Sequence, residues 1–314
     1  MVSANPAIDT DFPAVVVAPM AGGPSTPALV NAVTFGFLAL GTCSADSARN
    51  QLAAAQAPFG ANLFYPQAEP DYADVARVAG QLGAQVPEVD VSSGFVEKFQ
   101  LVLEAAPAIV SSTFGCFSSE EIAQLRESGS QAWVTVTSEA EAVQAQDRGA
   151  DGLIVQGPAA GGHRGTWQQG DEPDGRPLPE LLTAVRGETR LPLMAAGGVR
   201  GAADVEKLLS LGAVSVACGT AFLLAEEAGT SEDNRALLRG GGVSVSSRAF
   251  SGRWARGLET GFTRAHPDMP AIYPYLKPMV PDNTYCLVGE NFAGIAEAPA
   301  AWIEADLTPG SAPR

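Results

Sequence analysis

The sequence AWVTVTSEAEAVQAQDRGADGLIVQ, residues 132–156, contains a complete strand–helix–strand unit. The runs at 132–137 and 152–156 are largely apolar or β-branched on consecutive positions, which is typical of parallel strands covered on both faces. Between them, Ser138 is followed three residues later by Glu141, which is the spacing of a capping box, so a helix is predicted over 138–149.

Apolar runs of the same kind recur along the chain, with helix-like segments between them. The eight predicted strands cover residues 14–19, 35–41, 59–64, 108–112, 132–137, 152–156, 191–196 and 213–218. Helices are predicted over residues 74–83, 118–129, 138–149 and 202–211. Eight strands with helices between them favour an α/β fold of the (β/α)8 TIM-barrel type, with a doubly wound parallel sheet as the alternative.

The sequence changes in character after the eighth predicted strand. It contains three consecutive glycines at 240–242 and the proline-spaced run HPDMPAIYPYLKP at 266–278, which is more chain than a barrel needs to close. These features predict a barrel, a lid or small subdomain inserted after strand eight, a C-terminal segment that returns to the barrel, and a flexible tail. The corresponding residues are 1–239, 240–285, 286–307 and 308–314.

Composition excludes several kinds of partner. The 314 residues carry 19 Lys and Arg against 35 Asp and Glu, a formal net charge of −16, so neither nucleic acid nor an anionic membrane surface is expected as a partner. No apolar stretch approaches the ~20 residues of a membrane helix and no signal-peptide pattern is present, so a cytoplasmic location is expected. With four widely spaced cysteines, no CxxC pair and two histidines, no metal site is expected.

Glycine-rich turns follow the last predicted strands, where a barrel of this type has its active site. Glycine pairs stand at 161–162 and 197–198, and Gly219 is followed by Thr220. Glycine lets backbone N–H groups approach a phosphate closely, so these turns indicate a phosphorylated cofactor or substrate. The alternative is that the glycines only turn the chain.

His163 is the clearest candidate for catalysis, because it follows the glycine pair at 161–162 and a histidine side chain ordinarily titrates near neutral pH. The alternative is an ordinary loop histidine. The chain has only three lysines, Lys98, Lys207 and Lys277, and none lies on a predicted strand, which excludes Schiff-base chemistry at a strand centre. Carboxylates are missing from these strand ends, which argues against a magnesium enolase site or a paired-carboxylate glycosidase.

Six motifs resemble those of the nitronate monooxygenases, FMN-dependent barrel enzymes formerly called 2-nitropropane dioxygenases. The resemblance runs in order from about residue 13 to 260, with a weaker match at 286–303, and it does not separate this family from the related FMN- and NADH-dependent enoyl-ACP reductases. The motifs are APMAGGPSTPAL (18–29), FGANLF (59–64), QGPAAGGHRGT (156–166), MAAGGV (194–199), ACGTAFL (217–223) and RAFSGRWARGLE (248–259).

The resemblance implies an FMN site within the barrel and assigns roles by position. His163 falls on the family's active-site histidine, and Tyr273 and Lys277 match its lid residues over the substrate. One position departs from the pattern, since many relatives carry a glutamate where this chain has Ala159. The residues implied to bind the flavin are Met20, Asn62, Gln156, Gly161, Gly162, Gly198, Ala217, Cys218, Gly219 and Thr220.

The implied reaction is the oxidation of an alkyl nitronate by molecular oxygen to a carbonyl compound and nitrite, through a flavin semiquinone. The first alternative is an FMN- and NAD(P)H-dependent reductase of the enoyl-ACP type, and the second is a flavin-binding sensor or carrier without catalysis. A phosphate-binding barrel of the IMP dehydrogenase type fits badly, because it needs a catalytic cysteine in a mobile loop and Cys218 lies in a predicted strand.

Overall fold

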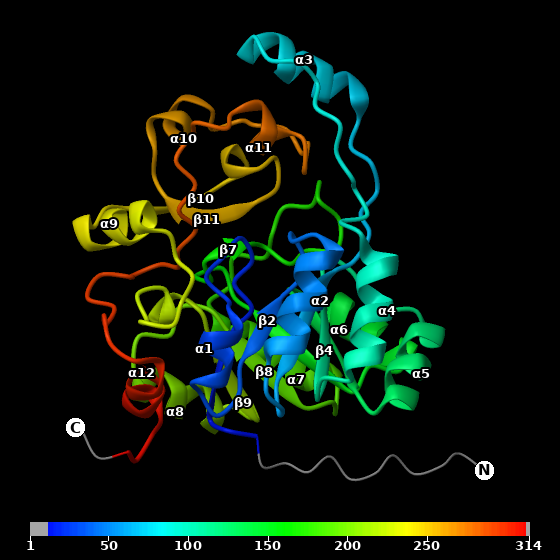
Figure 1. Cartoon of the computed structure of the whole chain (residues 1–314), viewed down its shortest axis with the longest axis vertical. Helices are drawn as coiled ribbons and strands as arrows, with labels where there is room; N and C mark the ends of the chain where they lie inside the picture. The colour runs from blue at the N-terminus through cyan, green and yellow to red at the C-terminus, as the bar shows by residue number, and fades with distance from the viewer. Residues whose placement is uncertain (1–11, 312–314) are drawn as a thin grey trace.

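The computed structural model describes residues 12–311, and its centre is a parallel sheet of eight strands. In sheet order the strands run β1-β9-β8-β6-β5-β4-β3-β2, and a parallel bridge between Val17 and Gly36 links the two ends, which makes a (β/α)8 barrel (Figure 1). The strands are β1 (Val15–Val17), β2 (Phe37–Ala39), β3 (Gly60–Phe64), β4 (Ile109–Thr113), β5 (Gln131–Val136), β6 (Gly152–Gln156), β8 (Leu193–Ala196) and β9 (Ser215–Cys218).

Helices cover the outside of the sheet and bury its outward-facing apolar side chains. They are α1 (Pro27–Asn31), α2 (Ala45–Ala54), α4 (Phe95–Ala105), α5 (Ser119–Ser128), α6 (Glu139–Arg148), α7 (Leu178–Glu188), α8 (Ala202–Ser210) and α12 (Ala300–Leu307). No helix in the described part of the chain combines the length and apolar character that crossing a bilayer requires.

The start of α6 is only half of the capping box that the spacing predicts. The Ser138 hydroxyl accepts a hydrogen bond from the Glu141 backbone N–H at 3.2 Å. The Glu141 carboxylate, however, accepts from the Thr137 hydroxyl at 2.9 Å and from the Thr137 N–H instead of returning to Ser138. A complete box occurs at α5, between Ser118 and Glu121, and another between Thr260 and Thr263.

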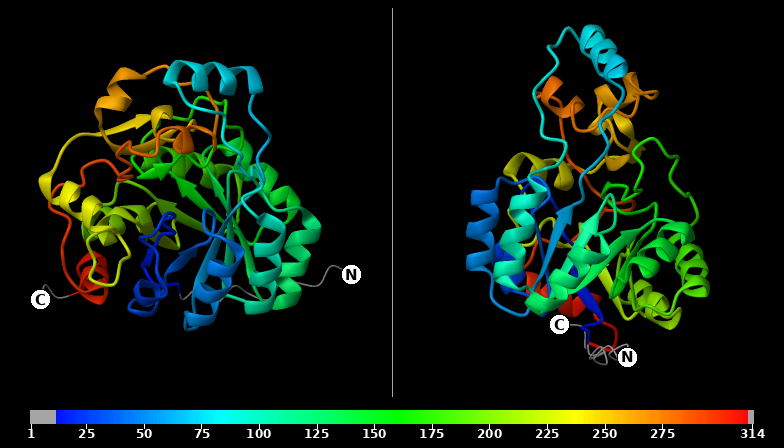
Figure 2. Two further views of the ribbon diagram at one scale, coloured as in Figure 1. Left: turned by 45° about the horizontal axis from the view of Figure 1, so that its top comes forward. Right: turned by 90° about the vertical axis from the view of Figure 1, so that its right-hand side faces the viewer.

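The helix predicted over 74–83 exists as α3 (Tyr72–Leu82), but it does not cover the barrel. It stands beyond the ends of the strands beside α11 (Leu276–Met279), as both views of Figure 2 show. The helix that covers the sheet between β3 and β4 is α4. The apolar face of α3 packs into a cluster of lid residues: Val75, Val78, Ala79, Ala249, Met269, Ile272, Leu276 and Met279.

A small antiparallel sheet connects the lid to the barrel. Its order is β10-β11-β7, formed by β10 (Ser244–Ser247), β11 (Ala255–Leu258) and β7 (Gly162–His163). Because β7 lies in the glycine-rich loop after β6, the lid pairs directly with the loop that carries His163. The remaining elements of this half are η1 (Thr220–Phe222), α9 (Glu232–Gly240), η2 (Arg248–Phe250) and α10 (Gly261–Ala265).

Candidate active site

A cavity of about 860 Å³ lies where the carboxyl ends of the barrel strands meet the lid. Every residue that the sequence predicts to bind cofactor or substrate lines it, from Met20 after β1 to Lys277 on α11. The structure brings these residues together because parallel strands of a barrel end at the same rim. The C-terminal segment adds to the lining through Leu287 and Gly289.

The glycines after β8 are needed for packing between neighbouring loops. Gly197 and Gly198 have φ values of +115° and +75°, in the region that favours glycine. A Cβ at Gly197 would lie 2.8 Å from the Ala160 Cβ, and one at Gly198 would lie 2.8 Å from the Ala159 Cβ. Contact with the loop after β6 therefore requires glycine at both positions, independently of any ligand.

These turns nevertheless present donors suited to a phosphate. Within residues 12–311, the backbone N–H groups of Gly197, Gly198 and Gly219 donate to no hydrogen-bond acceptor. At Gly219 an added Cβ would meet nothing closer than 3.5 Å, and at Gly162 it would enter open space. Free N–H groups beside a short helix-like turn fit the phosphate of a flavin mononucleotide.

The C-terminal segment joins two of these loops. The Gly289 N–H donates to the Thr220 hydroxyl oxygen at 2.9 Å, and the Glu290 N–H donates to the Ala159 carbonyl at 3.0 Å. A Cβ at Gly161 would lie 2.5 Å from the Gly289 nitrogen, so glycine at 161 allows this close approach. Residues 288–290 thereby hold the loops after β6 and β9 together.

His163 lies at the junction of barrel and lid. Its Nε2 is 2.8 Å from the Ser251 hydroxyl, and its ring meets those of Phe114 and Tyr273 edge-on at centroid distances of 5.8 and 5.3 Å. Burial among these groups, with a smaller contribution from the Arg253 charge, lowers the pKa of His163 to about 3. The imidazole is therefore neutral at neutral pH, with one ring nitrogen to donate and one to accept.

Gln156 holds the backbone around His163. Its Nε2 donates to the His163 carbonyl at 2.9 Å, and its Oε1 accepts from the Gly165 N–H at 2.8 Å. Asn62, inside β3, is fixed through its Nδ2, which donates to the Ser111 hydroxyl at 2.9 Å and to the Thr113 hydroxyl at 3.1 Å. Both amides thus keep one orientation beside the cavity.

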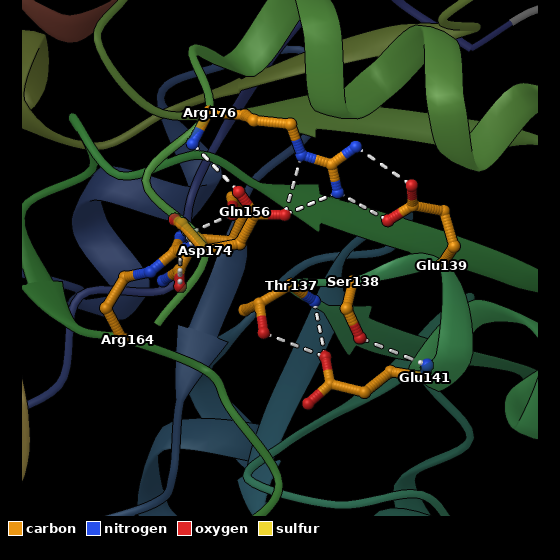
Figure 3. Close-up of polar contacts among 8 residues, drawn as sticks. All are labelled: Thr137, Ser138, Glu139, Glu141, Gln156, Arg164, Asp174 and Arg176. Atoms are coloured by element: carbon orange, nitrogen blue, oxygen red, sulfur yellow. Dashed lines mark hydrogen bonds and ion pairs between the residues drawn. The ribbon is translucent and has the colours of Figure 1, made fainter. Parts of the chain in front are cut away.

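A polar network anchors the loop after His163 on the start of α6 (Figure 3). Arg164 donates to the carbonyls of Gln156 and Asp174, and Arg176 pairs with Asp174 and, at 2.6 Å, with Glu139. Next to this network, Glu141 accepts from the Trp167 N–H at 2.9 Å. The position of His163 is thus set by the barrel through the 164–177 loop as well as by the lid.

The lid contributes Tyr273, Lys277 and Tyr285 to the cavity. Burial raises the pKa of Tyr273 to about 12, so its hydroxyl stays protonated. The Lys277 Nζ donates to the Asn283 carbonyl at 3.0 Å and lies 5.1 Å from the centre of the Tyr285 ring. Lys277 therefore also holds the 281–285 loop in place.

Sequence reasoning missed three residues that line this site, Ser251, Phe114 and Tyr285, and also Arg253, which lies against Phe114. Ser251 and Arg253 stand within the quoted motif RAFSGRWARGLE. The resemblance to the family therefore pointed to this segment, whereas a serine and an arginine taken singly did not. Phe114 follows β4 with φ +76°, and Tyr285 follows a proline-rich run. Neither has a pattern that would have identified it.

Comparison with known proteins identifies the family of this chain. The family model for nitronate monooxygenase matches residues 7–297. The nitronate monooxygenase of Paraburkholderia phytofirmans is 34% identical over 298 residues, covering 86% of this chain and 80% of the relative. That of Pseudomonas aeruginosa is 33% identical over 302 residues, covering 87% and 84%.

Solved structures with a similar fold include a relative of this family. A nitroalkane oxidase from Streptomyces ansochromogenes has a TM-score of 0.86 and 31% sequence identity, with 95% of this chain and 96% of that chain covered. FabK from Thermotoga maritima, at TM-score 0.69 and 21% identity over 94% and 91%, shares the fold. The chain therefore belongs to the nitronate monooxygenase family, which consists of flavin-dependent oxidoreductases.

Proposed function

We propose that this protein binds FMN and uses molecular oxygen to oxidise alkyl nitronates to carbonyl compounds and nitrite. The observation that carries the proposal is a histidine, hydrogen-bonded to Ser251, in a cavity that is also lined by Gly198 and Gly219 with their unpaired backbone N–H groups. The first feature suits a small reacting substrate and the second suits a cofactor phosphate.

The residues present fit the cofactor in both chemistry and space. The N–H groups of Gly198 and Gly219 would hold the phosphate, while Met20 and Asn62 would lie beside the ring system, as the family resemblance implies. A cavity of about 860 Å³ lies within the range of ligand pockets in general. The bound flavin supplies the electron transfer between nitronate and oxygen.

His163 has two possible uses, and the Ser251 hydroxyl allows both. If Ser251 donates to Nε2, the other ring nitrogen carries the proton and can donate to a nitronate oxygen. If Nε2 donates to Ser251, the other ring nitrogen has the free lone pair needed to take the α-proton of a neutral nitroalkane, but the lowered pKa of His163 makes it a weak base and favours the first role. Gln156 and the 164–177 loop keep the ring in place for either role.

The test starts with the visible spectrum of the purified protein under anaerobic conditions, before and after addition of an alkyl nitronate. We expect a flavin spectrum that changes with the nitronate and not with NADH, nitrite on admission of oxygen, and FMN on chromatography of the released cofactor. His163→Asn should keep the flavin and lose at least ten-fold in turnover. His266→Asn, which changes the other histidine of the chain, should lose neither.

Three results would count against the proposal. Rapid bleaching by NADH would favour the enoyl-reductase type of activity. A flavin that responds to neither compound would favour a sensor or carrier. Protein purified without flavin that also fails to bind added FMN would contradict the phosphate site at Gly198 and Gly219.

A further inference from the structure

Five basic side chains near His163 lack the carboxylate partners that so acidic a protein could supply. The net charge is −16, yet among the described residues none of the basic groups around His163 has a carboxylate within ion-pair distance. These groups belong to Arg164, Arg248, Arg253, Arg256 and Lys277. Their hydrogen bonds go to neutral acceptors instead, mostly backbone carbonyls. Among residues 12–311, none of these five charges is therefore neutralised by an ion pair, although carboxylates act on Arg164, Arg253 and Lys277 from a longer distance.

Arg253 is the most deeply buried of these groups, with no exposed surface. Its guanidinium donates to the carbonyls of Arg164 and Thr166 and to the side-chain oxygen of Gln67, all of them uncharged. The guanidinium carbon lies 4.0 Å from the centre of the Phe114 ring, a cation–π contact. A buried charge without a counter-ion acts on its surroundings with little screening by solvent.

Phe114 is the layer between this charge and the cavity. Its ring also meets those of His163 and Tyr273 edge-on, at 5.8 Å in both cases, and all three side chains line the cavity. The Phe114 ring thus separates the Arg253 charge from the part of the cavity where a substrate would contact His163. The carboxylates that act on Arg253, those of Glu141 and Asp171, make no hydrogen bond to it.

We infer that Arg253 is a specificity-determining residue, whose charge behind Phe114 makes the cavity prefer an anionic ligand over a neutral one of the same shape. This inference rests on the proposed function, in which the anion is a nitronate and its neutral counterpart is the parent nitroalkane. It assigns Arg253 no direct contact with the substrate. Its action is electrostatic, through a fixed charge that the fold leaves unpaired.

Arg235 provides a matched control for the loss of a buried arginine. It is 8% exposed and donates to four backbone carbonyls, those of Thr230, Leu224, Ala225 and Ala228. It lies on α9, makes no contact with His163, Phe114 or Tyr273, and has Glu232 at 3.8 Å. Its replacement removes comparable hydrogen bonds without removing the charge behind Phe114.

The experiment measures binding of butyrate and of butyramide to the flavin-loaded enzyme by isothermal titration calorimetry, since this pair differs mainly in charge. We expect the wild type to bind butyrate at least about ten-fold more tightly than butyramide. The attraction between the Arg253 charge and a carboxylate on the other side of the Phe114 ring is large enough for such a ratio. Arg253→Gln should abolish most of that ratio, Arg253→Lys should retain most of it, and Arg235→Gln should leave it unchanged. The ratio of kcat/KM for propyl-2-nitronate over 2-nitropropane should change in the same way.

The inference is overturned by any of three results. One is a wild type that binds butyrate and butyramide equally tightly. This result overturns the inference even if Arg253→Gln does not fold. The second is an Arg253→Gln variant with the wild-type ratio, and the third is an Arg235→Gln variant that loses the ratio equally. If the wild type prefers butyrate through Arg253 and yet oxidises no nitronate, the proposed function fails and the inference stands.

Discussion

The barrel and the lid are both held together by buried apolar side chains, but they are assembled differently. The barrel interior brings together residues from successive strands, such as Phe37, Trp133 and Ile154, each placed by its own strand–helix unit. The lid cluster joins α3, which follows β3, to residues 249–280, which follow β10. The lid therefore depends on contacts between distant parts of the chain, and we expect it to open without the barrel unfolding.

The largest effect is expected from the barrel interior. Trp133 on β5 has no exposed surface, and its ring meets the Phe12 ring edge-on at 5.5 Å. Trp133→Ala removes the largest fully buried side chain among the described residues, so the free energy of unfolding should fall by about 3–5 kcal/mol. Urea denaturation followed by circular dichroism measures this. A loss below about 1 kcal/mol would mean that the barrel tolerates a large cavity.

A smaller effect on global stability is expected from the lid. Leu276 on α11 and Leu181 on α7 both have no exposed surface, so Leu276→Ala and Leu181→Ala remove the same atoms from equally buried sites. Leu181→Ala should cost about 2–5 kcal/mol of unfolding free energy. Leu276→Ala should leave the barrel's own unfolding transition within about 1 kcal/mol of the wild type and should speed proteolysis of residues 65–94, because it destabilises a lid that opens separately. Equal losses would show that lid and barrel unfold as one unit.

The smallest effect concerns His163, which belongs to both regions. Its pKa of about 3 depends on burial under the lid, so the wild-type activity should show no ionisation of this residue near pH 6.5. In Leu276→Ala, with the lid loosened, the pKa of His163 should rise toward its ordinary value. The measurement is the activity of the wild type and of Leu276→Ala from pH 5 to 8, with the activity of His163→Asn subtracted as background. An inflection near pH 6.5 in the wild type would contradict the burial of His163.

The same pKa shift has a consequence for stability. Between pH 6.5 and 3 the unfolded chain protonates this histidine and the folded chain does not, so stability is lost as pH falls through that window. Wild type should therefore lose more unfolding free energy between pH 8 and pH 5 than His163→Asn does. Equal losses would show that His163 is not kept neutral in the folded protein.

The sequence predicts the barrel well because its strands carry their signal locally. The runs at 132–137 and 152–156 have the periodicity of buried parallel strands, and Ser138 marks the start of a helix. Residues from β3, β6, β8 and β9 meet in one cavity because the topology fixes where strands end. The residue types at those ends, glycine and His163, are therefore enough to predict a site there.

The lid contacts could not be predicted in the same way. An amphipathic pattern shows that α3 buries one face, but not whether that face meets the sheet or a distant segment. The contact between Ser251 and His163 and the place of Arg253 behind Phe114 depend on the pairing of β7 with β11, which no local signal encodes. For Gly197 and Gly198, the residue type was expected from phosphate binding, whereas the structure shows loop packing as a further cause.

The contacts of residues 288–290 have a consequence for the order in which the protein matures on the ribosome. All eight barrel strands have been synthesised once Cys218 is complete, yet the wall that joins Ala159, Gly161 and Thr220 comes about seventy residues later. A nascent chain can therefore contain all eight barrel strands while the pocket still lacks one side and the sheet still lacks α12. The pocket is therefore completed only near the end of translation.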